Sequence, residues 1–228
     1  MIRALTLLLL LHCVSASAGE PLRIAVAANF RGTLEQINQR YQQQSDQQIL
    51  LSSASTGVLA SQVSYGAPFD LFFSADSETP KKLLATGTGV SSACYALGQM
   101  SLVGGDFLAL QNSDLTLAIA NPKTAPYGRA AMEILSRPEL NLADRGNLVR
   151  GTNVLQAFGF WRAGAADLAL VARSLAPEGQ PIQPDWHQPL QQDLLVLQQS
   201  PALTAYLQWL GSDTVRQMII DAGYLPCP

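Results

Sequence analysis

The hydrophobic and polar positions of this chain repeat one pattern: a short apolar run, a cluster of small polar residues, and then an amphipathic segment. In the first unit, residues 22–28 form an apolar run typical of a buried strand, and Leu34, Ile37 and Tyr41 then recur at helical spacing. The pattern predicts further strands over residues 49–52, 70–74, 115–120, 148–150 and 168–172, separated by helices. Strands that alternate with helices predict an α/β fold with parallel strands.

Four of the junctions between a strand and a helix share one composition. They fall at residues 27–30 (Ala-Ala-Asn-Phe), 53–57 (Ser-Ala-Ser-Thr-Gly), 125–128 (Ala-Pro-Tyr-Gly) and 151–154 (Gly-Thr-Asn-Val). Each would present unpaired backbone N–H groups and short polar side chains at a helix N-terminus, which is a favourable place for an anion. Because the junctions form two separated pairs, we expect two lobes that close on one small oxyanion.

The order of the elements predicts where the two lobes divide. Residues 94–103 form an extended crossover, residues 179–189 an irregular segment, and residues 193–198 a returning strand. A terminal helix with a break near Gly211 then covers residues 202–222. We therefore expect lobe 1 over residues 19–97 and 192–228, lobe 2 over residues 98–191, and a hinge made of two crossovers.

The N-terminus predicts export. Arg3 gives a short basic start, an apolar stretch follows, and Ala16-Ser-Ala18 forms a cleavage signal, so residues 1–18 are expected to be a signal peptide. A lipid anchor at Cys13 is the alternative, although His12 stands where a small residue is expected before a lipidated cysteine. No later stretch approaches the roughly 20 apolar residues that a membrane helix needs, so a mature chain free in the periplasm is expected.

Two cysteines, Cys94 and Cys227, remain after cleavage. In an exported chain such a pair predicts a disulfide, which would contribute about 4 kcal/mol by closing a long loop. Two independent thiols are the alternative.

Composition and motifs exclude several classes of function. The net charge is −3, from 17 acidic and 14 basic residues, which argues against nucleic acid or an anionic membrane surface as partner. The chain lacks the nucleophile elbow, the Cys-x-x-Cys pair, the His-Glu-x-x-His motif and the phosphate-binding loop, and His187 is the only histidine after the signal peptide. We therefore expect a protein that is not an enzyme and uses no cofactor.

At the same junctions the chain resembles the periplasmic molybdate-binding proteins, the substrate-binding components of molybdate and tungstate ABC importers. The resemblance implies a two-lobe type II periplasmic binding protein, with a sheet flanked by helices in each lobe. It also implies that the protein is a monomer and delivers the oxyanion to a membrane permease. It is carried by a series of stretches along nearly the whole mature chain: residues 25–35, 52–57, 66–76, 117–122, 125–128, 166–172, 192–193 and 222–224.

The resemblance also implies a ligand set made of hydroxyls, an amide and backbone N–H groups. Carried over by position, lobe 1 supplies Ala28, Asn29, Ser55 and Thr56, and lobe 2 supplies Tyr127, Asn153 and Val154. Relatives often carry Ser or Thr at the position of Ala28, so one hydroxyl donor is missing here. Helix capping is the competing role for Asn29, Ser55 and Thr56, and packing between lobes is the competing role for Tyr127.

Other residues near the junctions leave alternatives open. Arg31 and Arg129 could add charge to the cleft, and Trp186 and His187 could cover its rim, but solvated or packed positions are more usual for all four. The same architecture could also bind sulfate, phosphate or a small organic acid. Hydrogenphosphate would require an acceptor carboxylate, for which Asp70 and Asp76 are nearest.

Two rival functions have a different character. A secreted serine hydrolase would need His187 brought to Ser55 across a large gap in the sequence. An exported sensor module that signals through a partner would share the architecture of a transport protein.

Overall fold

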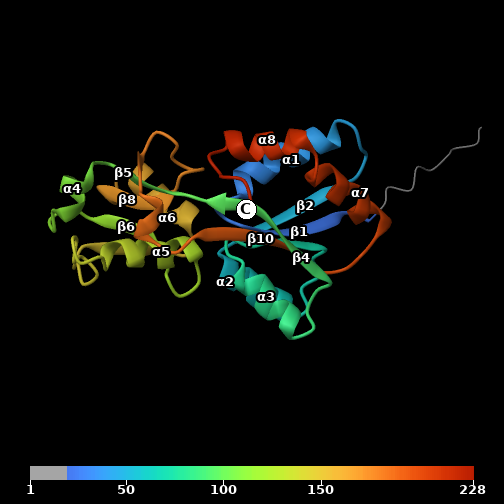
Figure 1. Cartoon of the computed structure of the whole chain (residues 1–228), viewed down its shortest axis with the longest axis horizontal. Coiled ribbons are helices and arrows are strands. Elements are labelled where there is room, and N and C mark those ends of the chain that lie inside the picture. The colour runs from blue at the N-terminus through green and yellow to red at the C-terminus, as the bar shows by residue number, and fades with distance from the viewer. Residues whose placement is uncertain (1–19) are drawn as a thin grey trace, which may run out of the picture.

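The computed structural model describes residues 20–228, so the predicted signal peptide and Cys13 lie outside the described residues. This part of the chain forms two five-stranded sheets, each flanked by helices, which lie side by side (Figure 1). The predicted α/β class is therefore confirmed. We call the part built on the first sheet lobe 1 and the part built on the second sheet lobe 2. Among residues 20–228, no helix is long and apolar enough to cross a membrane.

Lobe 1 has the strand order β2-β1-β3-β10-β4, in which β1 is parallel to β2 and β3, and β10 is antiparallel to both of its neighbours. Its strands are β1 (Leu22–Ala27), β2 (Ile49–Ala54), β3 (Leu71–Phe73), β4 (Ser91–Gly98) and β10 (Leu190–Val196). Its helices are α1 (Arg31–Gln42), α2 (Thr56–Ser64), α3 (Glu78–Ala85), α7 (Pro201–Leu210) and α8 (Asp213–Asp221).

The two faces of this sheet are covered by different helices because side chains alternate along each strand. Ile24 and Val26 of β1 pack in one core with Leu34 of α1, whereas Ala25 packs in a second core with Leu59 of α2. Figure 1 shows α1 and α8 on one face and α2 and α3 on the other. Since both faces are buried at the centre of the sheet, β3 is apolar throughout and β1 is apolar except at Arg23.

Lobe 2 has the strand order β7-β6-β8-β5-β9, and its buried residues form one core. Its strands are β5 (Met100–Val103), β6 (Leu117–Ala120), β7 (Leu148–Gly151), β8 (Leu168–Ala172) and β9 (Gln180–Pro181). Its helices are α4 (Phe107–Gln111), α5 (Pro126–Leu135), α6 (Val154–Arg162) and the 3-10 turn η1 (Pro184–Trp186). Strand β6 is parallel to β7 and β8, and β5 is antiparallel to β8.

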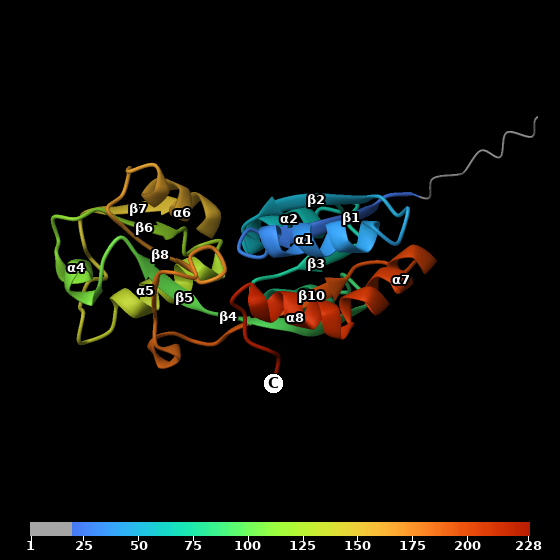
Figure 2. The same ribbon diagram turned by 90° about the horizontal axis from the view of Figure 1, so that it is seen from above.

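Two segments join the lobes (Figure 2). In the first, β4 ends at Gly98 in lobe 1 and β5 begins at Met100 in lobe 2. In the second, β9 ends in lobe 2 at Pro181 and β10 enters lobe 1 at Leu190. The chain thus returns to the sheet of lobe 1 at residue 190, two residues before the predicted boundary at residue 192.

Several predicted elements differ from the structure. Both sheets are mixed rather than parallel, because β5 and β10 run against their neighbours. The expected crossover over residues 94–103 is two strands, the irregular segment contains β9 and η1, and α4 has no predicted counterpart. The expected break near Gly211 is confirmed, since α7 ends at Leu210 and α8 begins at Asp213. Helix α3 begins after Ser77, and the Asp76 carboxylate accepts a hydrogen bond from the Thr79 N–H at 2.9 Å.

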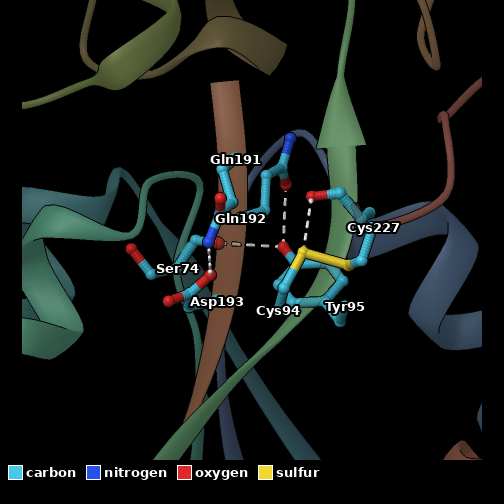
Figure 3. Close-up of a disulfide and its surroundings, with 8 residues drawn as sticks. Ser74, Cys94, Tyr95, Gln191, Gln192, Asp193 and Cys227 are labelled. Atoms are coloured by element: carbon cyan, nitrogen blue, oxygen red, sulfur yellow. Dashed lines mark hydrogen bonds between the residues drawn. A yellow bond between two sulfur atoms is a disulfide. The ribbon is translucent and has the colours of Figure 1, made fainter. Parts of the chain in front are cut away.

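A disulfide fastens the C-terminal tail to β4. Cys94 and Cys227 are bonded, with 6.0 Å between their Cα atoms, and Leu97 and Leu225 exchange two backbone hydrogen bonds beside them. Figure 3 shows that the bond lies next to Tyr95, whose hydroxyl group points toward Gln192. The disulfide therefore holds the tail against the strand that leads into the first crossover.

Removing this disulfide is expected to lower stability. The bond joins residues 133 positions apart; a loop of about that length corresponds to about 5 kcal/mol in the chain-entropy model, although measured effects are typically about 2–4 kcal/mol. We expect the double variant C94A/C227A to melt roughly 5–15 °C below the parent protein in calorimetry, since about 1 kcal/mol shifts the midpoint by roughly 2–4 °C at this chain length. An unchanged midpoint, with a free-thiol assay confirming the bond in the parent, would contradict this expectation.

Candidate functional site

A small cavity lies where the two lobes meet, and all seven residues predicted for the ligand site line it. Lobe 1 contributes Ala28, Asn29, Ser55 and Thr56, and lobe 2 contributes Tyr127, Asn153 and Val154. The cavity volume is about 10 Å³, about the space that the centre of one water molecule can occupy, so the lobes enclose it tightly. The remaining lining residues are Ala27, Ala75, Ala125 and Pro126. Residues from four separate junctions are thus brought to one place.

Ser55 provides a buried hydroxyl group with no partner in the described protein. The residue is 4% exposed and precedes helix α2, where serine usually caps the helix with its side chain. Here the side chain makes no capping bond, and Oγ forms no hydrogen bond within residues 20–228. Leaving a buried hydroxyl group unsatisfied costs about 1–3 kcal/mol, so such a group needs an explanation. A ligand in the cavity would provide one.

The hydroxyl group of the neighbouring Thr56 accepts a hydrogen bond but donates none within residues 20–228. Its Oγ1 accepts a hydrogen bond from the Ala75 N–H at 3.0 Å, which ties the start of α2 to the end of β3. A threonine hydroxyl group can accept and donate at the same time, so its proton is left for another acceptor.

Unpaired backbone N–H groups surround the same cavity. Within the described part of the chain, the N–H groups of Asn29, Ser55, Thr56, Tyr127 and Val154 make no hydrogen bond. Four of them belong to the starts of α2, α5 and α6, where the first N–H groups of a helix have no partner within it. Helix N-termini also carry a partial positive charge, so the three helix starts favour an anion between them.

Tyr127 adds a phenol group from lobe 2. Pro126 occupies the first turn of α5, a position that suits its fixed φ angle, and Tyr127 follows it with 2% of its surface exposed. Burial raises the pKa of this phenol well above its usual value, with a smaller contribution from Tyr224 in the same direction. The phenol therefore stays neutral and keeps its proton. Its Oη accepts a hydrogen bond from Gln192 Nε2 at 3.0 Å.

The two asparagine side chains and Ala28 have other partners. Asn29 Nδ2 donates to Gln192 Oε1 and to the Tyr224 hydroxyl group, so Asn29 offers the cavity its backbone N–H. Asn153 Oδ1 caps α6 by accepting from the Gln156 N–H at 3.0 Å. The Ala28 N–H is bonded to the Ala54 carbonyl, and Ala28 therefore contributes only a wall.

Among residues 20–228, no charged side chain lines the cavity. Asp70 accepts hydrogen bonds from the Arg23 N–H and the Gln198 side chain, and Asp76 accepts from Arg129. Neither carboxylate is among the lining residues, and Arg31 pairs with Glu35 on the surface of α1. The acceptor carboxylate that hydrogenphosphate would require is therefore missing from this wall.

Trp186 and His187 also lie away from the cavity. The Trp186 ring packs against Phe107 at 4.8 Å between ring centroids, and the half-buried His187 contacts the Gln188 carbonyl. Since His187 is not among the residues that line the cavity with Ser55, the geometry gives no support to a serine hydrolase.

The two lobes touch each other beside the cavity. The Gly57 N–H donates to the Thr124 carbonyl at 2.9 Å, and Arg129 Nη2 lies 2.6 Å from Asp76 Oδ2. These contacts join α2 to the segment before α5, and the end of β3 to α5 itself. The structure therefore has the lobes closed on the cavity.

Comparison with known proteins identifies the family. The family model described as "Bacterial extracellular solute-binding protein" matches residues 22–225. The chain belongs to this family. Two relatives described as "Molybdate-binding protein ModA" are similar over nearly their whole length: that of Azotobacter vinelandii is 32% identical over 94% of this chain and 93% of its own, and that of Rhodobacter capsulatus is 31% identical over 92% and 90%.

Solved structures share this fold, and they are named for different anions. The periplasmic molybdate-binding protein of Azotobacter vinelandii superposes with a TM-score of 0.82 at 29% identity, covering 91% of this chain and all of that one. The sulfate-binding protein SubI of Mycobacterium tuberculosis has a TM-score of 0.72 at 13% identity, covering 90% and 86%. At that identity the likeness shows the fold alone.

The sequence pattern missed the residues behind the cavity wall. Gln192 and Tyr224 lie only within the stretches that carry the family resemblance, and no local pattern points to Ser174, whose hydroxyl group donates to the Asn29 carbonyl at 3.2 Å. Gln192 could have been suspected, since it is one of three consecutive polar residues in β10, a strand otherwise apolar, and it is completely buried in the structure. Its partners could not, because they lie 65 to 163 positions away.

The contrast between Ser55 and Thr56 gives a test of the site. We expect Ser55→Ala to leave the melting temperature unchanged or slightly raised, because Oγ has no partner to lose, and to weaken anion binding by about 10- to 100-fold, since a hydrogen bond to a charged group is worth about 1.5–3 kcal/mol. Thr56→Val should instead lower the melting temperature, because the Ala75 N–H loses its acceptor.

The matched control for this test is Ser52→Ala, an exposed serine of the preceding strand, which should change neither quantity. Scanning calorimetry measures the melting temperature, and isothermal titration measures the anion affinity. Normal anion affinity in Ser55→Ala would remove Ser55 from the site.

Proposed function

We propose that this protein is an extracytoplasmic solute-binding protein that captures molybdate or tungstate between its lobes and delivers the anion to an ABC importer. The observation that carries the proposal is the cavity wall: neutral hydroxyl and N–H donors from both lobes, at three helix N-termini, with no charged side chain among them. We propose Ser55, Thr56, Tyr127 and the backbone N–H groups of Asn29 and Val154 as the ligand set. Ala28 and Asn153 shape its wall.

The donors suit a fully deprotonated oxyanion. A buried dianion loses its hydration shell, so it is stable only where protein donors replace the hydrogen bonds of water. Each helix N-terminus adds roughly 0.3–1 kcal/mol, and more where it is buried. Because no carboxylate lines the cavity, an anion that carries a proton finds no carboxylate acceptor there. This favours molybdate, tungstate or sulfate over hydrogenphosphate.

The relatives favour molybdate within this class. The two curated relatives at 31% and 32% identity are described as molybdate-binding proteins. Residues 1–18 would direct export to the periplasm, and the partner would be the permease of the importer. Sulfate is the second candidate, because the SubI protein shares the fold and sulfate also lacks a proton to donate.

Titration of the purified protein with four anions tests this proposal. We expect molybdate and tungstate to bind with similar affinity, sulfate to bind at least 100-fold more weakly, and hydrogenphosphate to compete more weakly still. Affinity should change little between pH 6 and 9, because burial raises the pKa of Tyr127 and its phenol remains a donor throughout that interval. Binding of neither molybdate nor tungstate would refute the proposal, and a preference for sulfate would change the substrate while keeping the architecture.

The ion pair between Arg129 and Asp76 is expected to favour the closed state. It joins the lobes without lining the cavity, and the Arg129 side chain is 43% exposed, so its contribution is that of a partly solvated pair, at most about 1 kcal/mol. We expect Arg129→Gln to weaken anion binding about two- to fivefold, mainly through faster dissociation in stopped-flow measurements. The control Arg31→Gln breaks a pair within α1 and should have no effect on dissociation.

A further inference from the structure

Gln192 is a completely buried amide at the second crossover between the lobes. Its Oε1 accepts hydrogen bonds from Asn29 Nδ2 and from the Tyr95 hydroxyl group, each at 2.8 Å. Its Nε2 donates to the Tyr127 Oη at 3.0 Å. One side chain therefore connects residues of lobe 1 to the phenol group that lines the cavity from lobe 2.

The direction of these hydrogen bonds decides whether the Tyr127 hydroxyl group can donate its proton to a ligand. An amide oxygen can only accept and an amide nitrogen can only donate. With Oε1 turned to Asn29 and Tyr95, the nitrogen is left facing Tyr127, and the phenol oxygen must accept from it. The phenol proton is then not used by Gln192 and is free for an acceptor in the cavity.

Asn29 holds the Gln192 amide in this orientation, because its Nδ2 can only donate and therefore faces Oε1, whereas the single proton of the Tyr95 hydroxyl group is shared between two acceptors. The Tyr95 hydroxyl group lies between Ser74 and Gln192, 3.0 Å from the Ser74 carbonyl oxygen (Figure 3). Asn29 Nδ2 also lies 3.1 Å from the Tyr224 hydroxyl group, which occupies its second hydrogen.

Gly98, at the end of β4, allows the phenol and the amide to meet. A Cβ atom at this position would lie 2.3 Å from Tyr127 Oη and 2.4 Å from Gln192 Nε2, closer than real Cβ contacts come. The first crossover therefore needs glycine at the place where the second crossover contributes Gln192.

We propose that Gln192 is a positioning residue that fixes Tyr127 as a hydrogen-bond donor toward the cavity and so selects oxyanions that carry no proton. The inference rests on the proposed function. It assigns selectivity to a residue that does not line the cavity. An anion with an acidic proton, such as hydrogenphosphate, needs an acceptor; the acceptor side of the phenol is already occupied by the Gln192 amide.

A double-mutant cycle tests whether Gln192 acts through Tyr127. Molybdate affinity is measured by isothermal titration for the parent protein, Gln192→Met, Tyr127→Phe and the double variant. We expect Gln192→Met to weaken binding about tenfold in the parent background and less than twofold in the Tyr127→Phe background. A merely structural role would weaken binding equally in both backgrounds, and additive losses would overturn the inference.

The second readout is the ratio of the affinities for molybdate and hydrogenphosphate, measured by competition at pH 8. In Gln192→Met the phenol can turn and accept the phosphate proton, so we expect this ratio to fall at least tenfold. An unchanged ratio would overturn the inference as well, because a distorted site would lose affinity for both anions together.

Gly98→Ala is the second variant, for the case in which Gln192→Met does not fold. The added methyl group displaces the phenol and amide but removes no donor. We expect it to weaken molybdate binding about tenfold in the parent background and less than threefold in the Tyr127→Phe background; equal losses would overturn the inference. A parent protein that binds neither molybdate nor tungstate would overturn the proposed function and this inference together, whereas additive variants of a protein that binds would overturn this inference alone.

Discussion

A doubly charged anion can leave water only where the protein returns the hydrogen bonds that water supplied, and this constraint explains the arrangement of the cavity. Donors aimed at such a ligand cannot also bond to each other. The chain therefore holds a buried Ser55 hydroxyl group and several backbone N–H groups without protein partners among the described residues. Unpaired donors of this kind are costly inside one lobe. They are tolerable at helix starts, where N–H groups are unpaired in any case, and at a surface where two lobes meet.

The absence of charged side chains from the cavity wall follows the same logic. A lysine or arginine would attract many anions, whereas a set of neutral donors fixed by helix backbones distinguishes them by number, direction and size. The charges that join the lobes are kept apart: Arg129 and Asp76 pair beside the cavity without lining it. Attraction between lobes and recognition of the ligand are thereby assigned to different residues, so each can change without the other.

The crossovers are reinforced where the network behind Tyr127 is anchored. Hydrogen bonds link Gln192 to Tyr95 directly and to Tyr224 through Asn29, and Tyr224 lies in the C-terminal tail. The disulfide between Cys94 and Cys227 fastens that tail next to Tyr95. The fold itself does not choose the anion, since a sulfate-binding protein of 13% identity shares it. We infer that the choice lies in which atoms face the cavity and in which direction their protons point.

Local sequence signals determined much of this molecule. Apolar runs and helical spacing predicted most strands and helices, and the small polar junctions predicted that Ser55, Thr56, Tyr127 and Val154 would stand at helix starts, because strand burial and helix initiation depend on neighbouring residues. The family resemblance is confirmed by the comparisons. That the seven predicted residues bind a ligand stays a prediction, although the structure gathers all of them around one cavity.

Only the tertiary structure decided the partners of each group. The sequence could not tell that the Asn29 side chain bonds to Gln192 rather than to the cavity, that Ser55 caps nothing, or that β5 and β10 run against their neighbours. These facts depend on contacts between residues up to 195 positions apart, such as Tyr224 and Asn29. Hydrogen-bond partners at that separation are set by how the lobes pack, and packing is a property of the whole chain that no local pattern contains.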